Sequence, residues 1–147
     1  MRDDNGEPHF DALAKLYVLG EKLIDGDFQD CVLSSVVSRS RERHRKERLY
    51  PGNSAASIIY KGTPASSPAR RFLVHILAAK GHRDWALNEK GGGGWNVPEE
   101  FKDDLIAELL SNAEDCQERR KYTWLDEGIP CEYHKHDKDK PCLSERA

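Results

Sequence analysis

Residues 9–37 constrain the fold most, because their apolar side chains recur at helical spacing on both sides of one short break. Asp25 and Gly26 form this break, and Asp27 with Asp30 can cap the helix that follows. Each helix needs a partner for its apolar face, and the other helix is the nearest candidate. The sequence therefore predicts a helix hairpin whose apolar and small positions are Phe10, Leu13, Leu16, Tyr17, Leu23 and Ile24, then Phe28, Cys31, Val32, Ser35 and Val36.

Three further segments are predicted to be helical. In the segment from Ser67 to Lys80, Ser67 and Pro68 suit the N-cap and first helical positions, and Gly81 suits the residue after the helix. The segment from Pro98 to Glu118 has four acidic residues among its first seven, and these favour the positive end of a helix dipole. The short segment from Ala55 to Tyr60 fits either helix or strand, and its alanines favour helix.

These segments predict an all-α fold with a hairpin from Pro8 to Ser38, two or three further amphipathic helices, flexible loops and an irregular C-terminal tail. We expect a flexible terminus at residues 1–7, a helical region at residues 8–125 and a polar tail at residues 126–147. Four consecutive glycines, Gly91 to Gly94, predict a flexible loop. The expected core consists of Leu13, Leu16, Leu23, Phe28, Val32, Phe72, Ile76, Phe101, Leu105 and Leu109.

The composition of the chain restricts its location and partners. The 147 residues are 37% apolar and 33% charged, with a net charge of −3, and the mean hydropathy is −0.79. This charge gives no global attraction to nucleic acid or to an anionic membrane. No apolar run has the roughly eighteen residues of a membrane span, and no signal-peptide pattern opens the chain. We expect a cytoplasmic or nuclear protein whose four cysteines are thiols or metal ligands.

The tail contains the strongest metal-ligand pattern of the sequence. Cys131, His134, His136 and Cys142 offer two thiols and two imidazoles, and Cys116 could replace one of them. Four such ligands can hold a structural zinc ion, which would order a segment that has little apolar surface to bury. Apart from the Cys-x2-His element, the spacing is not that of usual zinc fingers. The alternative is that the cysteines pack or stay exposed and the histidines are solvated.

Arg39 to Arg48 is a dense charged run with six cationic side chains and two glutamates. It could attract RNA phosphate or serve in nuclear import. It could equally be a solvated loop, or a helix extension in which glutamates partly neutralise arginines. No aromatic side chains interleave to stack bases, so the second interpretation is preferred.

Single residues suggest interaction more than catalysis. Trp85, Trp95 and Trp124 lie in or beside loops, where an amphipathic ring can pin a loop onto helices or bind a partner. We favour pinning. Cys31 is expected to be a small buried hydrophobe, and His75 a boundary or hydrogen-bonded histidine. Common phosphate-loop, dinucleotide-binding, zinc-protease and nucleophile-elbow motifs are absent from the sequence, so no catalytic or cofactor-binding residue is assigned.

Four motifs occur in the order seen in one protein group. The hairpin sequence around LYVLGEKL resembles the last two helices of a BTB/POZ domain. IIYKGTPASSPARRFLV, WNVPEEFKDDLIAELL and CEYHKHDKDKPC resemble the continuation of fungal BTB/POZ proteins. The N-terminal BTB portion, which supplies the dimer interface and most of the ligase-scaffold surface in that family, is missing before His9. We therefore expect a truncated product or a free-standing C-terminal region, and ligase-adaptor activity is not carried over.

The resemblance implies a non-catalytic protein-protein interaction module. Its expected partner is another protein, and an orphaned apolar edge of the hairpin could favour self-association. Neither nucleic acid nor a membrane is expected as a partner. The alternative is a helical module that is stabilised by zinc or associated with nucleic acid.

Overall fold

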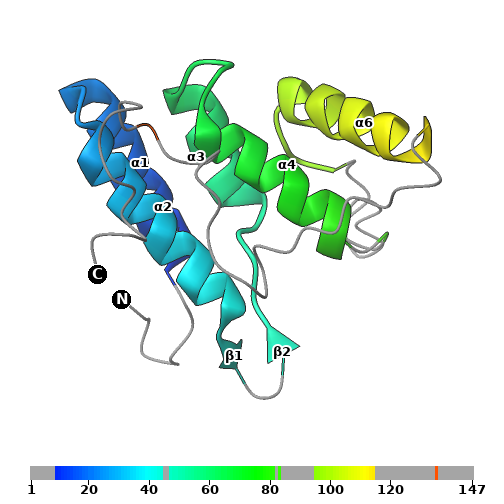
Figure 1. Cartoon of the computed structure of the whole chain (residues 1–147), viewed down its shortest axis with the longest axis horizontal. Helices are drawn as coiled ribbons and strands as arrows, with labels where there is room; N and C mark the ends of the chain where they lie inside the picture. Colours follow the sequence, from blue (N-terminus) through cyan, green and yellow to red (C-terminus); the bar gives the residue numbers. More distant parts are fainter. Residues whose placement is uncertain (1–8, 45–46, 82, 84–94, 115–134, 136–147) are drawn as a thin grey trace.

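The computed structural model describes residues 9–44, 47–81, 83, 95–114 and 135, and within them the protein is all-α as predicted (Figure 1). These residues also contain two antiparallel β-strands of two residues each, with Arg43 opposite Arg48. The elements are α1 (Phe10–Leu23), α2 (Gly26–Arg41), β1 (Arg43–His44), β2 (Glu47–Arg48), α3 (Asn53–Gly62), α4 (Pro68–Lys80) and α6 (Glu99–Glu114).

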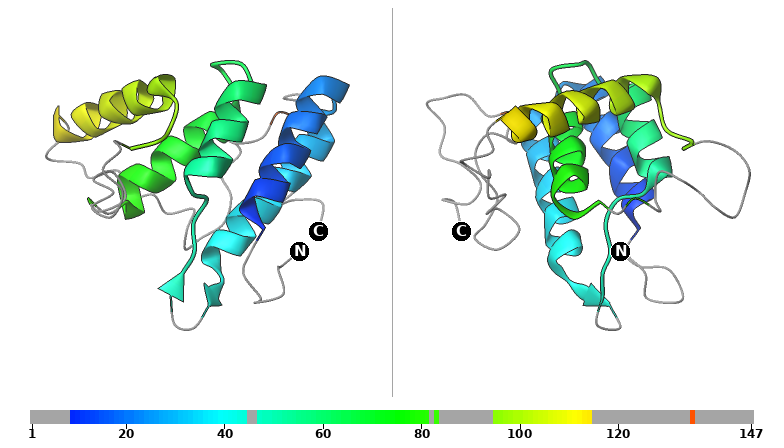
Figure 2. Two further views of the ribbon diagram at one scale, coloured as in Figure 1. Left: turned by 180° about the vertical axis from the view of Figure 1, so that it is seen from behind. Right: turned by 90° about the vertical axis from the view of Figure 1, so that its right-hand side faces the viewer.

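The helices form a series of neighbours around one core. Helices α1 and α2 make the predicted hairpin, and α3 packs along α1. Helix α4 lies beside α3 and carries α6 on its other side, at the edge of the molecule (Figures 1 and 2). The segment between β2 and α3 leads from the β-pair back to the helices (Figure 1). None of the described helices is both long and apolar enough to cross a membrane.

The break between α1 and α2 is built differently from the prediction. Ile24, and not Gly26, makes the turn: its φ of 54° is left-handed, a conformation that β-branched residues rarely adopt. Asp25 caps α2 by accepting a hydrogen bond of 2.9 Å from the backbone N–H of Phe28. Asp27 and Asp30 were expected to be the caps, but both lie inside α2, since the helix already begins at Gly26.

Two glycines allow the first helices to pack closely. A Cβ atom on Gly20 would lie 2.6 Å from Cγ of Gln29 in α2. A Cβ atom on Gly62, at the end of α3, would collide with the Val18 side chain of α1. Both positions therefore require glycine for close approach of neighbouring helices. Gly81 directly follows α4 as predicted, and its φ of −62° is not left-handed.

Most of the predicted core is correct, with two exceptions. Leu23 is 63% exposed and Leu109 is 46% exposed. At 3.6 residues per turn, Leu23 lies roughly 240° around the helix from the buried Tyr17, and Leu109 roughly 80° from the buried Phe101. Leu16 and Phe28 are partly buried against the core. The buried members of the predicted set are Leu13, Val32, Phe72, Ile76, Phe101 and Leu105.

The predicted helix boundaries agree with the structure within a few residues. Ser67 precedes α4 and Pro68 is its first residue, but the Ser67 hydroxyl makes no capping hydrogen bond. Helix α3 extends beyond the predicted segment at both ends. Residues 115–118, predicted as the end of the last helix, lie outside the described residues, as do residues 1–8, the four glycines and all of the tail except Lys135.

A buried arginine joins three helices. Arg70 of α4 is 6% exposed and donates hydrogen bonds to the carbonyl oxygens of Tyr60 and Thr63 at the end of α3. It also pairs with Glu100 of α6 at 2.6 Å and lies 4.4 Å from the Tyr60 ring centroid. These contacts satisfy helix-terminal carbonyls that α3 cannot pair itself. Arg70 therefore fixes the ends of α3 and α6 relative to α4.

Candidate functional site

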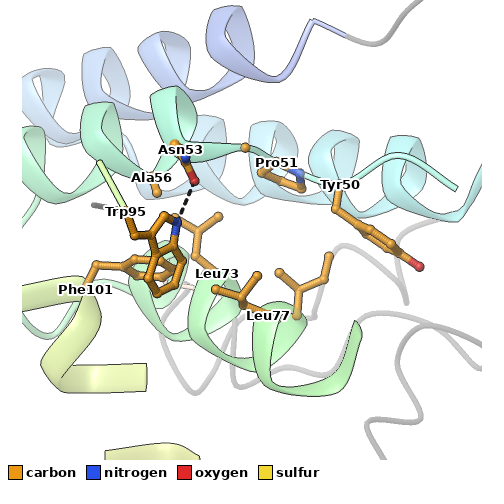
Figure 3. A pocket seen from close by; sticks show the side chains of 10 residues that line it. Tyr50, Pro51, Asn53, Ala56, Leu73, Leu77, Trp95 and Phe101 are labelled. Carbon is orange, nitrogen blue, oxygen red and sulfur yellow. Dashed lines mark hydrogen bonds between the residues drawn. The ribbon is translucent and has the colours of Figure 1, made fainter. Parts of the chain in front are cut away.

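An apolar pocket of about 280 Å³ lies between α3, α4 and the start of α6 (Figure 3). Its walls come from the segment before α3, one face of α3, one face of α4 and the segment before α6. Tyr50 and Trp95 lie toward opposite ends in the close-up view. The described lining residues are Tyr50, Pro51, Gly52, Asn53, Ala56, Leu73, Ile76, Leu77, Trp95 and Phe101.

The aromatic end of the pocket is held by specific contacts. The indole Nε1–H of Trp95 donates to Oδ1 of Asn53, at the first turn of α3, over 3.0 Å. The Trp95 ring meets Phe101 edge to face, with centroids 5.7 Å apart. Phe101 in turn meets Tyr60 edge to face at 5.3 Å. Such contacts fix ring orientation, so this wall is shaped before any ligand arrives.

The floor of the pocket follows from helical spacing in α4. Leu73, Ile76 and Leu77 are spaced by three and four residues and therefore share one face of the helix. Leu73 and Ile76 are buried, whereas Leu77 is partly exposed. The side chains supply aliphatic and aromatic surface, with the Tyr50 hydroxyl and the Asn53 amide as polar groups. This chemistry suits an apolar guest.

The structure places one of the three predicted interaction tryptophans at this pocket. Trp95 pins the segment before α6 onto α3 through its bond to Asn53 and also offers one ring edge to the pocket. Trp85 and Trp124 lie outside the described residues. Nothing in the local sequence patterns of Tyr50 and Leu77 indicates that they line the same pocket.

The predicted zinc ligands Cys131, His134, His136 and Cys142 lie outside the described residues, as does Cys116. Across the part of the chain that the structure describes, no group of three or more His, Cys, Asp or Glu side chains is placed to hold a metal ion. The zinc site therefore stays a prediction from the sequence.

The structure contradicts the prediction for Cys31 and agrees with the prediction for His75. Cys31 is exposed, which corrects the prediction of a buried thiol. It is on the outer side of α2, while Val32, Leu33 and Val36 carry the buried face. His75 has a side chain 13% exposed, with Nε2 3.9 Å from Oε2 of Glu108. It is a boundary histidine, as expected.

A second hollow, more polar, lies between α4 and α6. It has a volume of about 320 Å³. Cationic and anionic side chains both line it, and the Arg70–Glu100 ion pair and the His75–Glu108 contact with α6 border it. A hollow with both signs of charge gives no clear preference for one ligand. Its described lining is Ala65, Arg70, Arg71, Val74, His75, Asp104, Ala107 and Glu108.

The charged run from Arg39 to Arg48 is partly a helix extension. Helix α2 continues to Arg41, and Arg39 pairs with Glu42 at 3.2 Å. The chain then forms the short β-pair around residues 45–46, which lie outside the described part. The pairing of Arg39 with Glu42 is the neutralisation that the preferred interpretation expected.

Comparisons with known proteins gave no match: no family model, no curated protein and no solved structure is similar to this chain.

Proposed function

We propose that the protein is a non-catalytic protein-interaction module whose apolar pocket takes up a bulky apolar side chain from a partner polypeptide. The observation that carries this proposal is the pocket between Tyr50 and Trp95, with apolar walls and rings held in place by contacts within the protein. Interfaces gain most of their binding energy from a few apolar or aromatic anchors seated in such pockets.

The pocket favours binding over catalysis through the chemistry of its walls. Its described lining contains neither a charged side chain nor a thiol or imidazole. The indole N–H of Trp95 already donates to Asn53. A guest would therefore gain mainly from removal of apolar surface from water.

The relation to fungal BTB/POZ proteins belongs to this proposal and rests on sequence likeness. In those proteins the region that this chain resembles comprises the last two BTB helices and the segment that follows them. An in-frame BTB core encoded upstream of Met1 would support the relation, and an unrelated upstream sequence would oppose it.

Binding can be tested with short peptides that carry one central leucine, phenylalanine or tryptophan in a glycine-serine background. Titration of isotope-labelled protein should shift the indole N–H signal of Trp95 and the methyl signals of Ile76 and Leu77. Leu77→Asp places a carboxylate in the wall and should weaken binding about tenfold or more, because the charge loses water when a guest enters.

Leu110→Asp is the matched control, since Leu110 is 61% exposed on α6 and does not line the pocket. It should leave peptide affinity unchanged. The proposal fails if the peptides shift signals elsewhere, if Leu77→Asp binds as well as the parent protein, or if reproducible turnover of a small molecule is found.

A further inference from the structure

Lys135 lies against the turn of the α1–α2 hairpin, more than one hundred residues away in sequence. Its backbone N–H donates to Oδ1 of Asp30 over 2.7 Å, and its Nζ donates to Oε2 of Glu21 over 2.6 Å. An ideal Cβ atom on Gly26 would lie 3.5 Å from the Lys135 backbone, which is an ordinary contact distance. The hairpin therefore holds both the main chain and the charged end of this one residue.

Asp30 is suited to hold a main chain because the protein encloses it. The residue is 1% exposed, and a buried carboxylate is costly unless hydrogen-bond donors reach it. One donor is the Lys135 N–H, which comes from outside the helix hairpin. Recognition through a backbone N–H requires a defined path of the chain and not merely a nearby cation.

Gln29 orients the Glu21 carboxylate from within the hairpin. Gln29, which is 2% exposed, donates to Oε2 of Glu21 over 2.7 Å, and this same oxygen accepts the Lys135 ammonium. Partial burial alone would raise the pKa of Glu21, but the hydrogen bonds from Lys135 and Gln29 and the Lys135 charge outweigh burial and lower the pKa. Glu21 is thus a carboxylate whose orientation a buried amide fixes.

We propose that Glu21, Gln29 and Asp30 form a lysine-recognition notch whose occupant is the chain's own Lys135, so that residue 135 is attached to the helix hairpin by a latch that depends on the positive charge of lysine. The notch binds two features together: an ammonium group at Glu21 and a backbone N–H at Asp30. Loss of the charge removes the first contact and leaves the second alone.

Amine reactivity of the full chain tests the latch. A limiting amount of an N-hydroxysuccinimide ester of acetic acid is added, and peptide mass spectrometry gives the acetylation rate of each lysine. Lys135 should react about fivefold more slowly than Lys22, an exposed lysine beside the notch, because an amine in an ion pair with a hydrogen bond is less available. Glu21→Gln should bring the two rates close together.

Asp27→Asn is the matched control, since Asp27 is an exposed acid in the first turn of α2. It removes one negative charge near the notch and should leave the Lys135 rate unchanged. Lys135→Arg and Lys135→Gln give a second readout: hydrogen exchange at the α1–α2 turn should stay slow with arginine and become faster with glutamine.

Three results would overturn the latch. One is an acetylation rate of Lys135 equal to that of Lys22 in the unaltered protein, a result that no folding defect of a variant can cause. Another is slow reaction of Lys135 that persists in a folded Glu21→Gln protein. Faster reaction in Glu21→Gln and Asp27→Asn alike would also contradict the proposal, because it would show a general charge effect.

Discussion

Helices α2 and α6 have the same length, sixteen residues each, but very different burial. Helix α2 contains many serines, arginines and aspartates and nevertheless buries seven residues, among them Gln29, Asp30 and Ser40. Helix α6 contains a run of large apolar side chains, of which Phe101 and Leu105 are buried while Ile106, Leu109 and Leu110 are about half exposed or more. Burial thus does not follow the apolar content of the helix.

The neighbours of each helix explain the difference. Leu33 and Val36 of α2 border a small interior space of about 20 Å³ together with side chains of α1, α3 and α4. Helix α6 packs mainly against α4 and touches α3 with its first turns. Its attachment combines two apolar side chains with polar contacts, namely Arg70 to Glu100 and Tyr60 to Asp104. Helix α2 is therefore part of the centre of the core, and helix α6 lies at its edge.

Truncation of one leucine in each helix tests this comparison most directly. Leu33→Ala should lower the free energy of unfolding by about 3.5 kcal/mol, because Leu33 is 2% exposed and its loss enlarges an interior space. Leu110→Ala should change it by less than about 0.5 kcal/mol, since Leu110 is 61% exposed. Urea unfolding followed by circular dichroism measures both. Similar losses of unfolding free energy for the two variants would show that α2 and α6 contribute alike to the core.

Removal of Arg70 tests the polar attachment of α6. Arg70→Ala should cost about 3 kcal/mol, because it leaves the carbonyl oxygens of Tyr60 and Thr63 buried without this donor. Glu100→Gln should cost far less, since the Glu100 side chain is 71% exposed. Equal effects of the two changes would show that the ion pair, and not the carbonyl contacts, carries the stability.

Alkaline pH should weaken the region around α1 and α2 through Tyr17. Burial raises the pKa of Tyr17 to about 12 from the ordinary 10.0, and the Ser67 side chain partly offsets this rise. Between these values the unfolded chain loses the phenol proton while the folded chain keeps it, so stability falls as the pH rises. The slope should be about 1.4 kcal/mol per pH unit for this group. Tyr17→Phe should reduce the slope of unfolding free energy against pH in this window.

The smallest expected effect concerns the hydrogen bond between Tyr60 and α6. The Tyr60 hydroxyl donates to Oδ2 of Asp104 over 2.7 Å, and burial together with Asp104 raises the pKa of Tyr60. Tyr60→Phe should cost about 1 kcal/mol, the usual net value of one hydrogen bond. The indole signal of Trp95, which reports the neighbouring ring contacts, should stay in place. A large movement of that signal would mean that Asp104 orients α6.

The sequence predicted the helices well because their signals are local. Apolar spacing marks α1, α2 and α4, Pro68 marks the start of α4, and acidic residues mark the start of α6. The predicted helix boundary was less accurate where a residue adopts a backbone conformation that is unusual for its type. Ile24 takes the left-handed turn although Gly26 is two residues away. A local pattern could not show this, because the packing of α1 on α2 decides where the turn falls.

The candidate site was predicted only in part. The sequence predicts that Trp95 pins a loop onto the helices or binds a partner, because its amphipathic ring lies beside a loop. The pocket itself joins Tyr50, Leu77 and Phe101 from three separate segments, and no sequence spacing relates them. No sequence pattern distinguishes Lys135 from the other polar residues of the tail, and only its contacts with Glu21 and Asp30 do so.

Residue type and spacing alone determined that this chain folds as packed amphipathic helices, since periodic apolar faces must leave water. Tertiary structure decided which of several like residues has a special role. Arg70 is buried while its neighbour Arg71 is exposed. Among three nearby acids, Asp25 caps α2, Asp27 is exposed and Asp30 is buried against Lys135. The physical reason is that desolvation and hydrogen-bond partners depend on what the rest of the chain brings to a position.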